Sequence, residues 1–312
     1  MNESSETRRA AHHNRRSGPV RSGRSRVITG ATMLALALLT ACSGGSSTSS
    51  PTAPSPPGTS AVFYVAIGAS DAAGVGSSVP CLPLTACSDG TGYVPVIARR
   101  LRASREVTLT NLSLPGGVLS PDLETLGNSI GRQTPGNFID RLAPFVPPQA
   151  TLVTIFAGAN DTNTIATAIG AGRGGGDPAG YLTQQVQAYA RDYGRLLDAV
   201  RTRAPGALIV VLNLPNMGAL PYVAGRPLAE RRIVQEVAVR LTTEAINPLA
   251  SRVPVVDAMC DGRSYDPGIY SADGFHPNDA GYAYLADLLL PAITAGSAPA
   301  PAARCGFMTL VG

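Results

Sequence analysis

The sequence predicts a three-layer α/β/α sandwich around a central parallel sheet. From residue 61 onward, short apolar runs rich in β-branched residues alternate with longer segments of helical spacing. This alternation indicates a parallel sheet that is covered by helices on both faces. The composition agrees, because 44% of the 312 residues are hydrophobic and 15% are charged, as in a globular domain with a sizeable core.

The expected elements divide residues 61–312 into five strands and five longer helices. Each expected strand is short and bounded by Gly, Pro or charged residues, and the five lie at 62–67, 107–114, 151–157, 207–214 and 253–259. Helical spacing predicts helices at 92–103, 136–145, 181–203, 229–252 and 279–293. Long loops at 72–91, 162–180 and 216–227 are expected to form the rim of a site at the strand ends.

The first 42 residues are interpreted as an export signal. Seven arginines precede an apolar stretch at 27–41, which is too short to span a membrane comfortably. Leu39-Thr40-Ala41-Cys42 resembles a bacterial lipobox, in which Cys42 becomes the lipidated first residue of the mature protein. The alternative is an ordinary cleaved signal with an incidental cysteine. We therefore expect a protein anchored to the cell envelope, or secreted if Cys42 is not lipidated.

Residues 43–60 are rich in Ser, Pro, Gly and Thr and are expected to form a tether between the anchor and the folded domain.

The formal net charge of +4 comes from the arginines of the leader, and the remaining charges nearly balance. A nucleic-acid partner normally requires a basic face, so none is expected. We expect a monomer whose partners are a membrane, through the anchor, and a small-molecule, lipid or glycan ester.

Four cysteines remain after Cys42, and an even number in an exported protein permits two disulfides. We favour Cys81 with Cys87, because the intervening residues form a short turn-like loop, and Cys260 with Cys305. Reduced, buried thiols are the alternative. Without a C-x-x-C motif or a Cys/His cluster, no metal site is expected, and no organic cofactor is expected.

Ser70 is the candidate nucleophile. It follows the first expected strand directly, where ligands bind in open α/β sheets. The alternative role is a helix N-cap. A hydroxyl needs a base, and His276, after the last strand, is the one histidine beyond the leader. Asp273, three residues earlier, can orient the imidazole and stabilise its positive form.

Two further segments can supply donors to a developing oxyanion. Gly116 follows the second strand and can bring its backbone N–H close, while Asn160 follows the third strand with a side-chain amide. Either segment taken alone could be a turn. Along the chain, Ser70 follows the first expected strand, Gly116 the second, Asn160 the third, and the Asp273–His276 pair the fifth.

These residues resemble the four blocks of the SGNH hydrolases, also called the GDSL esterase/lipase family. The resemblance implies a flavodoxin-like α/β/α fold, with Ser70 as nucleophile, His276 as base and Asp273 as its orienting acid. It also implies an oxyanion hole made by the Ser70 N–H, the Gly116 N–H and the Asn160 side chain.

The resemblance is incomplete. Ala69 and Asp71 replace the aspartate and leucine of the family's Gly-Asp-Ser-Leu block, and Ser113 stands where a glycine is common. Asp71 is a candidate cap of the following helix. A competing nucleophile, Ser129, lies in a G-x-S-x-G motif, but the preceding residues are polar and helix-like rather than a buried strand.

The glycine pattern at Gly170, Gly172 and Gly175 does not join a strand to a helix, so it indicates a loop rather than a dinucleotide site.

The main hypothesis is a serine esterase that cleaves carboxylic esters, with short acyl chains favoured because the chain has no Trp and few aromatic residues for sugar stacking. The alternatives are a non-catalytic glycan- or protein-binding lipoprotein on the same scaffold, a polysaccharide O-acetyl esterase and an acyltransferase.

Overall fold

The computed structural model describes residues 61–81, 83–85 and 87–312. The predicted signal, the lipidation site Cys42 and the tether lie outside these residues. Across the described ranges, no helix combines the length and the apolar character needed to cross a membrane.

A five-stranded parallel sheet forms the centre of the domain, in the order β2-β1-β3-β4-β5. The strands are β1 (Val62–Gly68), β2 (Val107–Ser113), β3 (Leu152–Phe156), β4 (Leu208–Leu212) and β5 (Val255–Val256). This is the flavodoxin-like order, so the predicted fold class is confirmed. The register aligns the carboxyl ends of the strands in one row, where Gly68 lies beside Ser113 on one side and beside Phe156 on the other.

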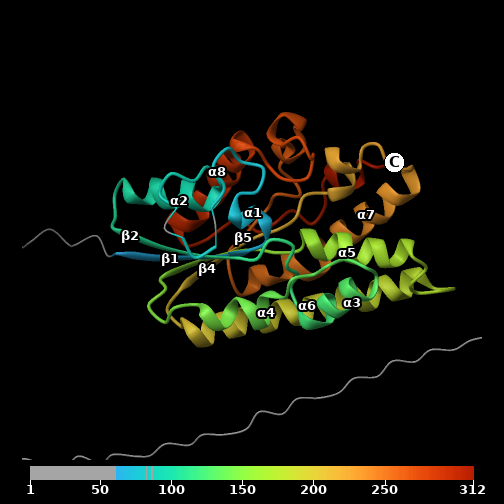
Figure 1. Cartoon of the computed structure of the whole chain (residues 1–312), viewed down its shortest axis with the longest axis horizontal. Helices are drawn as coiled ribbons and strands as arrows, with labels where there is room; N and C mark the ends of the chain where they lie inside the picture. The colour runs from blue at the N-terminus through green and yellow to red at the C-terminus, as the bar shows by residue number, and fades with distance from the viewer. Residues whose placement is uncertain (1–60, 82, 86) are drawn as a thin grey trace, which may run out of the picture. The chain divides into compact units, whose positions relative to one another are not determined.

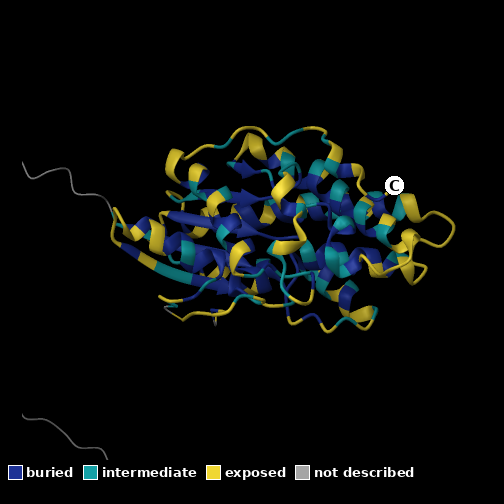
Figure 2. Ribbon diagram, turned by 90° about the horizontal axis from the view of Figure 1, so that it is seen from above, coloured by how far each residue is buried: buried dark blue, intermediate teal, exposed yellow. Residues whose placement is uncertain are grey.

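Helices cover both faces of the sheet, with α2 and α8 on one side and α4 and α6 on the other (Figure 1). The helices are α1 (Ser70–Ala73), α2 (Tyr93–Arg102), α3 (Pro121–Ser129), α4 (Phe138–Arg141), α5 (Ala159–Gly170), α6 (Pro178–Arg203), α7 (Leu228–Arg240) and α8 (Asp279–Ala295). The inner strands and the inward faces of the helices are mostly buried, while the edge strand β2 is partly exposed and the outward faces of the helices are exposed (Figure 2). Fully buried tyrosines fill much of the core, among them Tyr64, Tyr93 and Tyr189.

Several predicted boundaries were wrong. The expected loop at 162–180 begins as helix α5, and only the residues between α5 and α6 form a loop. The expected helix at 229–252 ends as α7 at Arg240 and continues as a π-helical turn, Leu241–Ile246, and a 3-10 turn, Asn247–Ser251. Pro248 lies in that last turn and cannot donate an α-helical hydrogen bond.

The expected helix at 136–145 is the short α4 followed by a 3-10 turn, Ala143–Phe145, which contains Pro144. The expected strand at 253–259 shortens to Val255–Val256. The reason lies in Asn213, whose Oδ1 accepts hydrogen bonds from the N–H groups of Ala258 and Met259 at 2.7 and 3.1 Å. These bonds replace a strand ladder with a turn.

Both favoured disulfides are present. Cys81 bonds to Cys87 within the α1–α2 connection, and Cys260 bonds to Cys305 across 45 residues. The second bond ties the C-terminal segment to the turn that follows β5. Disulfides persist in oxidising compartments, which agrees with the predicted export.

Candidate active site

Ser70 lies at the point where β1 turns sharply into α1. Gly68 ends the strand, and a Cβ there would approach the Ala72 Cβ to 2.8 Å, so the tight turn requires glycine. The turn is fixed from a neighbouring strand, because the buried Asn111 of β2 donates from Nδ2 to the Ala72 carbonyl at 2.8 Å. Asn111 is therefore a positioning residue that sequence reasoning left without a role.

The segment after β5 brings His276 to Ser70. The imidazole Nε2 lies 2.8 Å from the Ser70 Oγ, and its Nδ1 lies 2.6 Å from the Asp273 Oδ2. The intervening Gly274 has φ +67°, and a Cβ there would meet the Tyr222 backbone N at 2.7 Å. The three side chains that the sequence singled out therefore form one hydrogen-bonded chain.

The Asp273 carboxyl receives a dense set of hydrogen bonds. Its Oδ1 accepts from the backbone N–H groups of Phe275 and His276 and from the Ser271 hydroxyl, at 2.8 to 2.9 Å. Partial burial by itself raises the pKa of Asp273, but the bonds from the His276 ring, these backbone N–H groups and Ser271 outweigh it and hold the pKa well below its ordinary value. Asp273 is therefore ionised at neutral pH.

The loop after β2 and the start of α5 are bonded to each other. The Asn160 Nδ2 donates to the Gly117 carbonyl at 2.9 Å, and the Asp161 Oδ1 accepts from the Leu119 N–H at 2.7 Å. Asn160 therefore has one amide hydrogen engaged and one remaining. Gly116, at φ +79°, has no backbone acceptor for its N–H within the described residues.

Asp161 is nearly inaccessible to solvent, and its second oxygen, Oδ2, is buried with no hydrogen-bond partner in the described structure. Burial is the dominant effect and raises the pKa of Asp161 to about 7, against the lowering effects of the Leu119 N–H, its own N–H and the charge of Arg132. Asp161 clamps the loop after β2 to α5, a role that the sequence analysis did not assign.

Asp71 does not cap a helix. The helix begins at Ser70 with Ala69 at the cap position, so Asp71 lies inside its first turn. The residue is 7% exposed. Burial raises the pKa of Asp71, although the nearby positive form of His276 opposes this effect.

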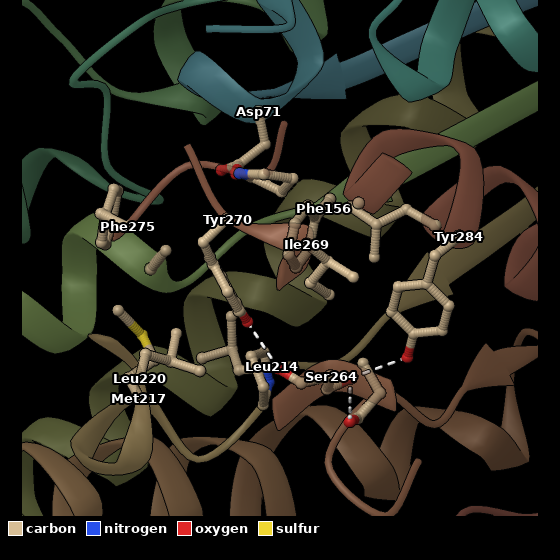
Figure 3. A pocket seen from close by; sticks show the side chains of 16 residues that line it. Asp71, Phe156, Leu214, Met217, Leu220, Ser264, Ile269, Tyr270, Phe275 and Tyr284 are labelled. Atoms are coloured by element: carbon tan, nitrogen blue, oxygen red, sulfur yellow. Dashed lines mark hydrogen bonds between the residues drawn. The ribbon is translucent and has the colours of Figure 1, made fainter. Parts of the chain in front are cut away.

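A cavity of about 50 Å³ lies beside these groups at the carboxyl ends of the strands (Figure 3). Its wall is mainly apolar and aromatic, and it includes Phe156, Leu214, Met217, Ile269, Tyr270 and Phe275. Asp71 reaches into it from α1, while the hydroxyls of Ser264 and Tyr284 bond to each other at the opposite end (Figure 3).

The competing nucleophile is placed elsewhere. Ser129 ends helix α3 and donates its hydroxyl hydrogen to the Leu126 carbonyl at 2.7 Å, with no strand before it. Gly170 ends α5, so the glycine pattern does not follow a strand. In the described part of the chain, His, Cys, Asp and Glu side chains form no cluster of three or more that could hold a metal ion.

A parallel α/β/α sheet with a serine, a histidine and an aspartate linked at its carboxyl ends is the arrangement of a serine hydrolase. The sequence profile of the GDSL-like lipase/acylhydrolase family matches residues 66–284. The chain therefore belongs to this family, whose members share the SGNH hydrolase fold, and it is a carboxylic ester hydrolase.

One protein of known sequence and one solved structure are similar to the chain. The chain is 30% identical over 188 residues to GDSL lipase Rv0518 of Mycobacterium tuberculosis, a match that covers 59% of this chain and 68% of that protein. The fold is similar to the crystal structure of an extracellular lipase from Streptomyces rimosus. That match has 17% identity and a TM-score of 0.50, and it covers 76% of this chain and all of the other.

Proposed function

We propose that the protein is a serine esterase that hydrolyses carboxylic esters with short acyl chains through an acyl-Ser70 intermediate. The observation that carries this proposal is the hydrogen-bonded chain from the Ser70 Oγ through His276 to the Asp273 Oδ2. A serine hydroxyl becomes a nucleophile when a positioned base takes its proton. His276 is within reach of that proton, and the ionised Asp273 fixes the tautomer in which Nε2 is free to accept it.

In the first half of the reaction, the Ser70 Oγ bonds to the ester carbonyl carbon while its proton passes to the His276 Nε2. The carbonyl oxygen becomes an oxyanion, which the Ser70 N–H, the Gly116 N–H and the free amide hydrogen of Asn160 stabilise. The bond to the alcohol oxygen then breaks, and His276 returns the proton to that oxygen. Donors of this kind are each worth about 3 kcal/mol of the barrier.

In the second half, water replaces the alcohol. His276 takes a proton from the water, whose oxygen bonds to the acyl carbon and again forms an oxyanion. The bond to the Ser70 Oγ then breaks, Ser70 regains its proton from His276, and the carboxylic acid leaves.

The preference for short acyl chains rests on the cavity beside Ser70. An apolar cavity of about 150 Å³ accommodates benzene, whereas this one measures about 50 Å³. The smaller volume favours a short acyl chain over a long one.

The proposal is tested with p-nitrophenyl esters from acetate to palmitate, using residues 43–312 and the Ser70→Ala variant. We expect kcat/KM to fall beyond butyrate, and the variant to lose at least ~10⁴-fold in kcat. The Ser129→Ala variant is the matched control and should retain full activity. Activity that survives in Ser70→Ala would contradict the assignment of Ser70 as the nucleophile. Absence of hydrolysis of every ester would favour the binding-protein alternative.

We further propose that the protein is exported and held to the envelope through a lipid on Cys42. The support is the lipobox-like sequence, the tether and two disulfides in the folded domain. Metabolic labelling with a fatty acid should mark the wild-type protein and not the Cys42→Ala variant. Equal labelling of the two would contradict the anchor.

A further inference from the structure

The Asp71 carboxyl is a polar group in the mainly apolar lining of the cavity beside Ser70. It is 7% exposed, and no other described residue donates a hydrogen bond to its carboxyl. The related family block has leucine at this position, which would continue the apolar wall. Burial of a carboxyl that no neighbouring residue hydrogen-bonds is unfavourable, and such a group is found where a role compensates for its cost.

The side chain points into the cavity rather than into the core (Figure 3). The opposite wall offers it no partner, because the Ser264 hydroxyl bonds to the Ala258 carbonyl and to Tyr284, while the Tyr270 hydroxyl donates to the Ser264 carbonyl. The polar groups at that end are satisfied by each other. The partner of Asp71 must therefore come from what enters the cavity.

The cavity adjoins the reacting centre on several sides. Asp71 follows Ser70 directly, Ala159 precedes Asn160, and Phe275 and Pro277 flank His276, and all four of these neighbours line the cavity. An acyl group on the Ser70 Oγ that enters this cavity would share it with the Asp71 carboxyl.

We propose that Asp71 is a specificity-determining residue that selects short acyl groups bearing a hydrogen-bond donor, either a hydroxyl or an ammonium group, over plain alkyl chains. The donor supplies the partner that the carboxyl lacks, and the rest of the short chain contacts the apolar wall. This inference rests on the proposed esterase function, because it concerns the acyl group bound at the same serine.

The test compares p-nitrophenyl esters of butyric, 3-hydroxybutyric and 3-aminobutyric acid, using both enantiomers of the substituted acids and correcting for spontaneous hydrolysis. We expect the wild-type kcat/KM for at least one donor-bearing ester to exceed that for butyrate by about 10- to 100-fold, the worth of a hydrogen bond to a charged group. The substituted ester that is preferred identifies the donor.

Asp71→Leu should abolish this ratio, because leucine completes the apolar wall and offers no acceptor. The control is Asp122→Leu, an exposed aspartate on α3, which should keep the wild-type ratio. Near-UV circular dichroism confirms that each variant is folded. A wild-type enzyme without preference for either donor, or a preference that survives in Asp71→Leu, would overturn the proposal.

If the wild-type protein hydrolyses none of the esters, the esterase proposal fails. The preference of Asp71 for acids with a hydrogen-bond donor is then measured by the binding of the free acids. Free 3-hydroxybutyrate, 3-aminobutyrate and butyrate are titrated into the wild-type protein and followed by NMR. Tighter binding of a donor-bearing acid that is lost in Asp71→Leu supports the inference. Equal affinity for the three acids overturns it.

Discussion

Asp273 and Asp71 both lie close to the Ser70–His276 pair, but their environments differ. The Asp273 side chain is 48% exposed and accepts four hydrogen bonds. Asp71 is buried, and among the described residues no other residue donates a hydrogen bond to its carboxyl. The pKa of the first carboxyl is lowered and that of the second is raised. Environment rather than residue type therefore suits one carboxyl to orient the base and the other to meet a ligand.

Asp161 is a third case between these two. Like Asp71 it is buried with a raised pKa, but one of its oxygens holds the Leu119 N–H. On the proposals above, Asp273 acts in catalysis, Asp161 stabilises the loop after β2, and Asp71 selects the substrate. Substitution of each residue should therefore change a different measurement.

The largest effect is expected for Asp273→Asn. The amide cannot hold the imidazole tautomer that accepts the serine proton, so kcat should fall roughly 10³- to 10⁴-fold. The measurement is steady-state hydrolysis of p-nitrophenyl butyrate at pH 7 to 8. Asp266→Asn, on the same segment but capping a 3-10 turn, is the control and should remain active. A loss of less than tenfold in Asp273→Asn would remove Asp273 from its proposed role.

Asn160→Ala should lower kcat about 10²- to 10³-fold with a smaller change in KM, because the lost donor acts on the transition state. A KM effect that dominates in Asn160→Ala would indicate a role in substrate binding instead.

Asp161→Asn should flatten the pH dependence of stability. In the folded protein, burial raises the pKa of Asp161 to about 7, while in the unfolded chain the ordinary value is 3.8. The folded state therefore binds more protons between these values, so the free energy of unfolding falls as pH rises from about 4 to 7. This group contributes up to ~4 kcal/mol to that fall.

Asparagine preserves the acceptor for the Leu119 N–H but cannot ionise, so urea unfolding of Asp161→Asn should show a smaller decrease between pH 4 and pH 8. Asp122→Asn, at an exposed site, should follow the wild-type curve. Identical slopes for Asp161→Asn and wild type would show that Asp161 does not carry this dependence.

Asp71→Leu should give the smallest change, a gain of about 1–3 kcal/mol in the free energy of unfolding, because it removes a buried carboxyl without partners. The gain should be larger at pH 8 than at pH 5, since the ionised form is the costlier one to bury. A loss of stability in Asp71→Leu would mean that the Asp71 carboxyl stabilises the folded protein.

The sequence predicted the sheet and the catalytic candidates because both depend on short-range patterns. Apolar runs located the five strands. The parallel register aligns the carboxyl ends of these strands, and a strand precedes each of Ser70, Asn160 and His276 in the chain. The pairings of Cys81 and Cys260 were also predicted and are present.

The error at the last strand arose because a side chain far away in sequence decides the backbone there, whereas the helix errors at 136–145 and 229–252 lie at Pro144 and Pro248. Asn213 shortens β5 by bonding to Ala258 and Met259, and this contact leaves no trace in the local pattern of residues 253–259. The clamp from Asp161 to Leu119 and the bond from Asn111 to Ala72 are likewise long-range. The apolar spacing of Ile165, Ala166 and Ile169 was a usable signal for α5 that the sequence analysis passed over.

The most direct test of the account is reaction of the protein with a p-nitrophenyl alkylphosphonate, followed by peptide mass spectrometry. The Ser70 Oγ, activated by His276, should displace p-nitrophenol and carry one phosphonyl group per chain, with loss of esterase activity in proportion. A phosphonyl group on Ser129, or an unlabelled Ser70 in a protein that has lost its activity, would contradict the assignment of Ser70 as the nucleophile.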